Sequence, residues 1–204
     1  MKYERVLLKL SGEMLGENGK LFDHDMIDKV AKTLCKVADK GVQLGVVIGA
    51  GNIWRGRQGG KAQVMSAIEM PRVCEVYNAH KAVKKMEKGT IMLFAGGSGN
   101  PFFSTDTAVV LRAVEVEADA ILLAKNIDGV YDSAPKKHPD AKLIRELSYE
   151  KAQEMRLRVM DTAAFALCAD NKVPVVRVFM LDEPDNILKV LDGDDMGTTL
   201  TSEK

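Results

Sequence analysis

The strongest constraint on the fold is a repeated alternation between short apolar segments, rich in β-branched residues, and longer segments with helical periodicity. Strands are predicted at 6–10, 42–48, 91–95, 120–124 and 173–180, with weaker candidates at 64–68 and 72–77 and an edge strand at 197–201. Helices are predicted at 25–40, 78–88, 106–117, 149–155, 161–171 and 184–191, and a surface loop at 132–141. This order predicts an α/β fold: a single domain, residues 1–204, built as a three-layer α/β/α sandwich with a mainly parallel central sheet.

The charge balance excludes recognition of a partner by a broad electrostatic field. Lys plus Arg and Asp plus Glu number 29 each, so nothing indicates a nucleic-acid or membrane-surface partner. The three cysteines and three histidines show no metal-ligand spacing, so we expect reduced core thiols and no metal site built from these residues. The apolar run at 6–10 is too short for a signal peptide or a membrane span, and we expect a cytoplasmic protein.

Three of the predicted strands run into glycine-containing loops, at 9–12, 49–52 and 96–100. Ligands of open α/β sheets bind beyond the carboxyl ends of the strands. Glycine lets backbone N–H groups approach an anion closely, and a helix that follows adds the positive end of its dipole. The three loops together predict a site for several phosphates, although any one of them alone would only mark the end of a strand.

Charged residues near these loops indicate phosphoryl transfer. Lys9 lies within an apolar strand and is either aimed into the phosphate site or an edge-strand lysine facing water, and Arg55 is suited to grip a phosphate bidentately. Asp106 and Asp161 lie at predicted helix starts, where they either cap the helix or orient Lys9 and bind magnesium through water. The catalytic candidates are therefore Lys9, Arg55, Asp106 and Asp161, because this reaction needs positioning and positive charge rather than a nucleophilic side chain.

Two common phosphate-binding patterns are absent from the sequence. No G-x-x-x-x-G-K-[ST] motif occurs, which excludes a P-loop kinase. The loop at 96–99 lacks the third glycine of a dinucleotide fingerprint, and no acid ends the next strand as a ribose ligand.

Six segments along nearly the whole chain form a recognisable series: residues 6–12, 46–57 (VVIGAGNIWRGR), 96–106 (GGSGNPFFSTD), 128–131 (DGVY), 159–165 (VMDTAAF) and 176–180. In this order they resemble the bacterial uridylate (UMP) kinases of the amino-acid-kinase family. The stretch GNPFFSTD is highly specific, whereas DGVY is shared by other amino-acid kinases. The resemblance implies transfer of the ATP γ-phosphate to UMP with Mg²⁺ in pyrimidine nucleotide biosynthesis, by a homohexamer activated by GTP and inhibited by UTP.

The resemblance also implies roles for individual residues. Those that serve the phosphates of ATP would be Lys9, Leu10, Ser11, Gly12, Gly51 and Arg55, with Asn126 and Tyr131 flanking the adenine nucleotide. Those that line UMP would be Ala50, Ser98, Gly99, Asn100, Pro101, Phe102, Phe103, Ser104 and Thr105. From the residues alone we expect at least one of Phe102 and Phe103 to pack in the core beneath the loop. Residues 16–21 loosely match a region linked to GTP activation.

Three departures from the family pattern affect the site. Ala50 replaces a glycine, and Ala134 replaces an aspartate that contacts the nucleotide ribose. Either the loss of this aspartate weakens ATP binding, or a neighbour such as Asp132 substitutes for it. Between Arg57 and Lys61 the family carries a helix-sized segment, which includes an acid for the UMP ribose and a helix used in subunit pairing. This sequence passes almost directly from Arg57 to Val64.

Two other functions remain open at this point. One is a kinase of the same fold that phosphorylates an amino acid, acetylglutamate or carbamate. The other is a nucleotide-binding homologue that has lost catalysis through the missing segment. The loop at 96–106 argues against the first, and the gap with Ala134 favours the second.

Overall fold

The structure is a computed structural model that describes residues 1–11, 23–48, 62–133, 135, 138–157 and 159–202. Its strands are β1 (Arg5–Leu10), β2 (Gln43–Ile48), β3 (Ala62–Ser66), β4 (Glu75–Val76), β5 (Ile91–Ala95), β6 (Ala120–Lys125), β7 (Val130–Tyr131), β8 (Leu143–Ile144), β9 (Glu146–Ser148), β10 (Val176–Met180) and β11 (Thr198–Thr201). Its helices are α1 (His24–Asp39), α2 (Ala79–Met86), α3 (Thr105–Glu115), α4 (Tyr149–Glu154), α5 (Thr162–Asp170) and α6 (Asn186–Asp192).

In the described part of the chain, the main sheet has nine strands in the order β4-β3-β5-β2-β1-β6-β10-β11-β9. Pairing is parallel except between β10 and β11. The mainly parallel sheet predicted from the sequence is therefore confirmed. The prediction of an edge strand near the C-terminus was wrong, because β11 lies between β10 and β9. The sequence analysis also missed β7, β8 and β9, which are too short to show a periodicity.

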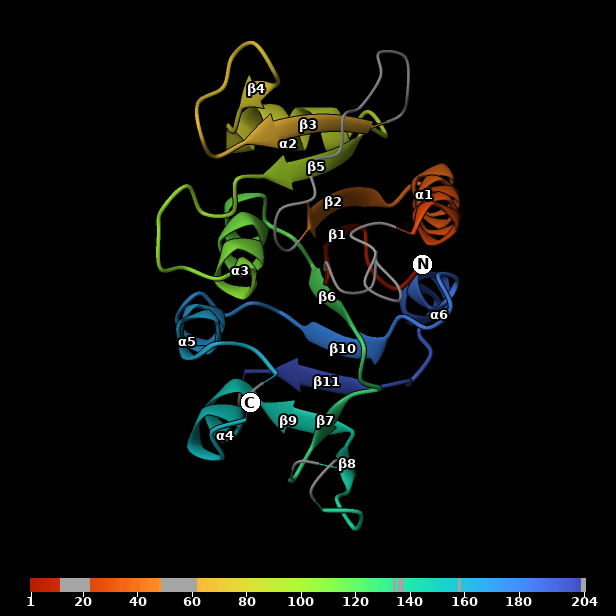
Figure 1. Ribbon diagram of the computed structural model, residues 1–204, viewed down its shortest axis with the longest axis vertical. Helices are drawn as coiled ribbons and strands as arrows, with labels where there is room; N and C mark the ends of the chain where they lie inside the picture. The colour runs from red at the N-terminus through yellow and green to blue at the C-terminus, as the bar shows by residue number, and fades with distance from the viewer. Residues whose placement is uncertain (12–22, 49–61, 134, 136–137, 158, 203–204) are drawn as a thin grey trace.

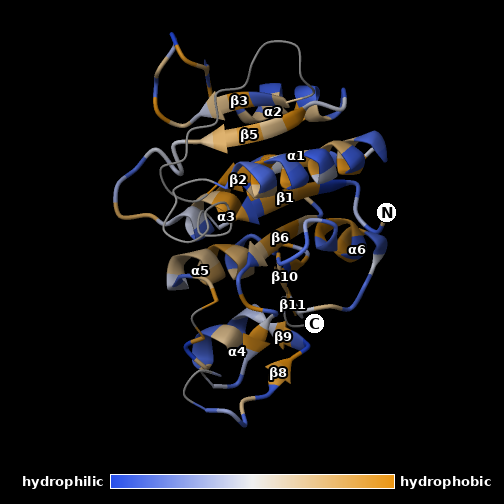
Figure 2. Cartoon of the chain, turned by 45° about the vertical axis from the view of Figure 1, so that its right-hand side comes forward, coloured by the Kyte–Doolittle hydropathy of each residue, from blue (hydrophilic) through white to orange (hydrophobic). Residues whose placement is uncertain are grey.

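Two hydrophobic clusters fill the two faces of the sheet and create the three layers (Figure 1). One cluster includes buried residues of α2, α3, α4 and α5, and the other includes residues of α1 and α6. Hydrophobic strands lie between helices that carry both hydrophilic and hydrophobic residues (Figure 2), as expected when each helix buries only one face. No helix of the described ranges is long and apolar enough to cross a membrane.

Successive side chains of a strand alternate between the two faces of the sheet, and this alternation determines which of them lie on the face covered by α3. Leu7 of β1 and both Ile121 and Leu123 of β6 pack in the cluster on the α3 side. Successive side chains of a strand point to opposite faces. Lys9 and Lys125 therefore share the α3 face, each at the carboxyl end of its strand.

Candidate active site

The described candidate residues gather where the strand order reverses. β1 lies between β2 and β6, so the crossovers from β1 run to one side and those from β6 to the other. In such sheets the crevice at the carboxyl ends of the strands is the usual ligand site. Ser11 follows β1, residues 96–104 follow β5, and Asn126 follows β6, so three described segments meet this edge.

Lys9 is buried in the middle of the sheet and paired with Asp106. Its Nζ lies 3.0 Å from Asp106 Oδ1 and 3.5 Å from Ser11 Oγ. The alternative of an edge-strand lysine was wrong, since Lys9 pairs with Val47 of β2 on one side and Leu123 of β6 on the other. A charge at such a place persists only when it is paired, which is what Asp106 provides.

Lys125 is a second cation of this cluster, and the sequence analysis missed it. Its Nζ lies 3.8 Å from Asp106 Oδ2 and also donates a hydrogen bond to the Val159 carbonyl. The sequence did contain a signal for this residue, because a lysine ends the apolar segment of β6 just as Lys9 lies next to the end of β1. Asp106 thus lies between two ammonium groups, and a pair of cations in one place suits a polyanionic phosphate.

Burial lowers the pKa of Lys125, and the nearby charge of Lys9 lowers it further. The Asp106 carboxylate acts in the opposite direction and raises this pKa. Asp106 is therefore the group that most favours the protonated form of Lys125 in this partly buried site.

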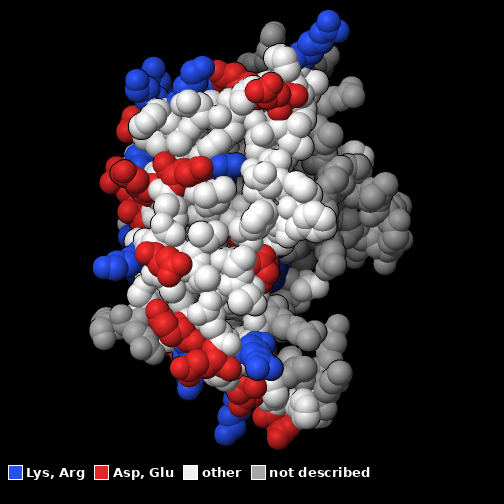
Figure 3. Space-filling model, turned by 90° about the vertical axis from the view of Figure 1, so that its left-hand side faces the viewer, with Lys and Arg blue, Asp and Glu red and all other residues white. Residues whose placement is uncertain are grey.

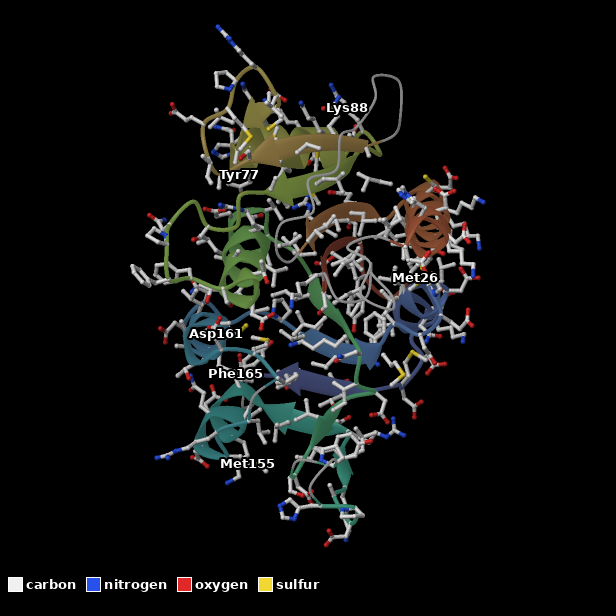
Figure 4. All side chains as sticks on the ribbon, viewed as in Figure 1. Met26, Tyr77, Lys88, Met155, Asp161 and Phe165 are labelled. Atoms are coloured by element: carbon white, nitrogen blue, oxygen red, sulfur yellow. The ribbon has the colours of Figure 1, made fainter. Side chains whose placement is uncertain are left out.

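Asp161 joins the N-termini of α3 and α5. It is the N-cap of α5, where its side chain accepts a hydrogen bond of 2.7 Å from the Ala164 N–H. It also accepts hydrogen bonds from the hydroxyls of Ser104 and Thr107, and Ser104 is itself the N-cap of α3. Both helices thus begin at the same place, and their positive dipole ends face the site. Figure 4 shows Asp161 on the α5 side of α3 and Tyr77 at its other side.

Hydrogen bonds to its charged form set the protonation of Asp161. Burial would raise the pKa of this carboxyl, but the hydrogen bonds from Ser104, the Ala164 N–H and Thr107 outweigh burial and lower the pKa. The carboxylate therefore stabilises the folded protein at pH values above the ordinary Asp range. That contribution is lost as the pH falls through the lowered pKa.

We expect Asp161→Asn to lower the free energy of unfolding at neutral pH by about 1 kcal/mol, because the dipole end and two hydroxyls lose a negative partner. The difference from the wild type should vanish as the pH falls below the Asp range. Urea unfolding at a series of pH values measures this. Asp170→Asn, at the C-terminal end of the same helix, is the matched control and should not destabilise. A difference that persists in acid would contradict the assignment to charge.

The segment 96–104 is shaped by left-handed backbone at defined positions. Gly99 has a φ of +81°, and a Cβ there would lie 3.0 Å from the Ala67 carbonyl oxygen, so the segment packs closely against the end of β3. Phe102 also has a positive φ, 68°. Phe102 is 104% exposed and Phe103 is 55% exposed. The expectation that one of them packs in the core was wrong, and both rings are open to a ligand.

A buried cluster around Arg112 supports the same segment from α3. The Arg112 guanidinium stacks over the Tyr77 ring at 3.8 Å, pairs with Glu115, and donates a hydrogen bond of 3.4 Å to the Gly97 carbonyl. Tyr77 donates from its hydroxyl to Glu115. One helix therefore carries Asp106 at its start and holds the 96–104 segment near its end.

A cavity of about 660 Å³ opens beside Asp106 and Asp161. Gln153, Arg156 and Phe165 also line it. Figure 4 shows Asp161 at the start of α5, Phe165 on α5 and Met155 at the end of α4. On the face formed by α3, α4 and α5, acidic side chains gather below an uncharged central area (Figure 3). Recognition of an anion here therefore depends on local groups such as Lys9 and Lys125.

The candidates for the adenine side lie next to β6. Asn126 directly follows this strand, and Tyr131 belongs to β7, which pairs antiparallel with β8. The Tyr131 hydroxyl donates hydrogen bonds of 2.9 Å and 3.0 Å to the two carboxylate oxygens of Asp128, which raises the pKa of Tyr131. Asp132 Oδ1 accepts from the Lys142 N–H, so this acid is engaged within the hairpin.

The residues present fit a hydrated magnesium ion. Magnesium is usually held by one or two carboxylates, waters and substrate phosphates. Asp106 Oδ1 is buried and, among the described residues, accepts no aligned hydrogen bond although Lys9 Nζ lies nearby, so a lone pair is left for a metal-bound water. Across the described ranges, no group of three or more His, Cys, Asp or Glu side chains is arranged to hold a metal ion directly.

Several predictions fall outside the described residues and stay predictions. These are Gly12, Ala50, Gly51, Arg55, Ala134, the segment 16–21 and the short connection between 57 and 61.

Comparison with known proteins places these features in a family context. Residues 56–178 match the model of the amino acid kinase family. The structure of UMP kinase from Bacillus anthracis is similar with a TM-score of 0.91 and 32% identity, over 100% of this chain and 98% of that chain. UMP kinase from Ureaplasma parvum matches with a TM-score of 0.86 and 30% identity, over 99% and 100%. Uridylate kinase from Archaeoglobus fulgidus, at 22% identity and a TM-score of 0.71 over 96% and 99%, shares the fold.

Proposed function

The chain belongs to the amino acid kinase family, and from this premise we propose that it is a UMP kinase, which transfers the γ-phosphate of ATP to UMP. The observation that carries the proposal is the cluster of Lys9, Asp106 and Lys125 at the carboxyl ends of β1 and β6. It supplies two cations where the strand order reverses, beside a loop sequence typical of UMP recognition.

The reaction needs no protein nucleophile. An oxygen of the UMP phosphate forms a bond to the γ-phosphorus of ATP, the bond from that phosphorus to the β,γ-bridging oxygen breaks, and ADP leaves with the electron pair. The second pKa of a phosphate monoester is about 6, so at neutral pH the attacking oxygen is already ionised and needs no general base. What the protein must supply is alignment and positive charge.

Each described residue then has a defined task. Lys9 and Lys125 place positive charge beside the transferred phosphoryl group, and Asp106 holds the two ammonium groups in position. Asp161 fixes the two helix N-termini so that their N–H groups face the phosphates. Asp106 and Asp161 would hold a bound Mg²⁺ through water, and the ion would supply further positive charge to the phosphates.

The substrate-binding assignments follow the family pattern. Ser98 to Thr105 hold UMP, and the exposed rings of Phe102 and Phe103 supply apolar surface for the nucleoside. Leu10, Ser11 and Gly12, with Gly51 and Arg55, serve the ATP phosphates, while Asn126 and Tyr131 flank the adenine nucleotide.

The proposal extends to the context of the enzyme. It includes residues 1–204 as one domain, a cytoplasmic location, a role in pyrimidine nucleotide synthesis, a homohexamer, activation by GTP and inhibition by UTP. The single domain and the cytoplasmic location rest on the sequence pattern. The pathway, the homohexamer and the regulation rest on the family resemblance.

A coupled assay of ADP release tests the function, with ATP, Mg²⁺ and each of UMP, CMP, aspartate and acetylglutamate, on protein of verified intact mass. We expect turnover with UMP at a rate in the usual enzyme range of about 1–1000 per second, and none with the amino-acid substrates. Turnover with acetylglutamate or aspartate while UMP stays inert would assign a different kinase of this fold. Nucleotide binding without any turnover would mean a non-catalytic homologue.

A further inference from the structure

A single buried hydroxyl group links both strands of the β7–β8 hairpin to the main sheet. Thr198, the first residue of β11, is fully buried. Its Oγ1 accepts a hydrogen bond of 2.8 Å from the Val130 N–H in β7 and donates one of 2.5 Å to the Ile144 carbonyl in β8. Val130 and Ile144 are directly paired across the hairpin, so a single side chain closes both strands onto the sheet.

The space around this hydroxyl leaves little freedom for the hairpin. A Cβ on Gly129 would lie 2.8 Å from Thr198 Oγ1 and 2.6 Å from Leu143 Cδ1, so the chain before β7 approaches β11 closely. The backbone adds one more link, since the Thr199 N–H donates to the Arg145 carbonyl at 2.8 Å. The hydroxyl is thus a specific attachment point within a tightly packed junction.

The hairpin carries residues of the donor side. Tyr131 immediately follows Val130, and its hydroxyl is held by Asp128. We propose that Thr198 is a positioning residue for the ATP nucleotide: its hydroxyl sets the place of the β7–β8 hairpin relative to the main sheet, and so the place of Tyr131. This rests on the proposed function, in which Tyr131 and Asn126 flank the adenine nucleotide.

Removal of the hydroxyl should act on ATP and leave UMP unaffected. Thr198→Val keeps the shape of the side chain but leaves the Val130 N–H and the Ile144 carbonyl buried without this partner, a state that folded proteins avoid. The hairpin should shift to satisfy them. Lys9, Asp106 and the 96–104 segment lie on other elements and should keep their positions.

The test is steady-state kinetics, together with direct titration of ATP binding, on the full-length chain. We expect Thr198→Val to raise the KM and the Kd for ATP about tenfold, while the KM for UMP and the kcat at saturating ATP change less than twofold. Thr198→Ser restores the hydroxyl and should recover at least half of the lost affinity. Thr199→Val, the same change on the opposite face of β11, should leave both constants unchanged.

The outcomes separate this inference from the proposed function. Unchanged ATP constants in Thr198→Val, or equal losses for ATP and UMP, would overturn the positioning role even if the wild type phosphorylates UMP. If the wild type binds ATP without phosphorylating UMP, the proposed function fails while the ATP titration still decides the role of Thr198. Thermal unfolding of each variant shows whether it is folded. If Thr198→Val proves unfolded, normal ATP affinity in Thr198→Ala would overturn the inference.

Discussion

Replacement of Lys9 by methionine should lower kcat by about a thousandfold, the upper end of the loss seen when one preorganised group at the reacting centre is removed. Methionine fills much of the same volume but brings no charge to the transferred phosphoryl group. Lys9 is buried between β2 and β6 with Asp106 as its partner, so no neighbouring side chain of the strand can replace it. Steady-state assay of ADP release with ATP and UMP measures the loss.

The control for Lys9→Met is Lys36→Met. Lys36 forms an ion pair with Asp185 at 3.1 Å, but this pair is exposed and joins α1 to the residue before α6 on the other face of the sheet (Figure 1). Its loss should leave kcat unchanged, because exposed pairs contribute little and this one lies outside the site. Normal turnover in a folded Lys9→Met variant would remove Lys9 from the mechanism.

Asp106→Asn should reduce kcat by about a hundredfold, because it loosens both lysines at once and small misplacements in a phosphoryl-transfer site are costly. It should also change the pH profile. The Asp106 charge raises the pKa of Lys125 against burial and Lys9, so its loss lowers that pKa further. If Lys125 acts as a cation, activity should decline on the alkaline side at a lower pH than in the wild type.

The free energy of unfolding should also depend on pH through the lowered pKa of Lys125. A lysine with a lowered pKa holds its proton less tightly in the folded state than in the unfolded chain, so the unfolded state binds more protons. The free energy of unfolding should therefore rise with pH between the lowered pKa and the ordinary lysine range, more steeply for Asp106→Asn than for the wild type. Urea unfolding over an alkaline pH series measures it, with Asp185→Asn as the control. If Asp106→Asn changes neither the alkaline decline of activity nor the rise of unfolding free energy with pH, this role of Asp106 is contradicted.

Much of the fold was predictable because buried parallel strands and amphipathic helices leave long patterns in the sequence. The segments 91–95 and 120–124 were predicted almost to the residue, since both are apolar runs bounded by polar residues. The hairpin of β7 and β8 was not, because its strands have only two residues each. They depend on pairing with each other and on contacts with Thr198, far away in the chain. The position of β11 also depends on pairing with β9, which no local pattern reports.

The site was predictable where the fold rule and the charge pattern agreed. Lys9 stood out as a charge in an apolar strand, and Asp106 as an acid at a helix start. The ion pair between Lys9 and Asp106 depends on the tertiary structure, and so does the contact of Lys125 with Asp106. The sequence alone therefore does not show either contact. The exposure of Phe102 and Phe103 was misjudged because hydrophobicity indicates burial, whereas the segment 96–104 turns both rings outward.

The central place of β1 also bears on how the chain acquires its structure. One neighbour, β2, follows soon after β1, but the other, β6, begins at Ala120, and β6 in turn pairs with β10, which begins at Val176. Contacts between residues so distant in the chain form slowly, because the intervening loop must close first. During synthesis, Lys9 therefore leaves the ribosome long before Asp106 and Lys125 are translated, and its ion pair with Asp106 forms only after that. Catalytic competence is then a late event of folding, and a nascent chain that stops short of β6 has none.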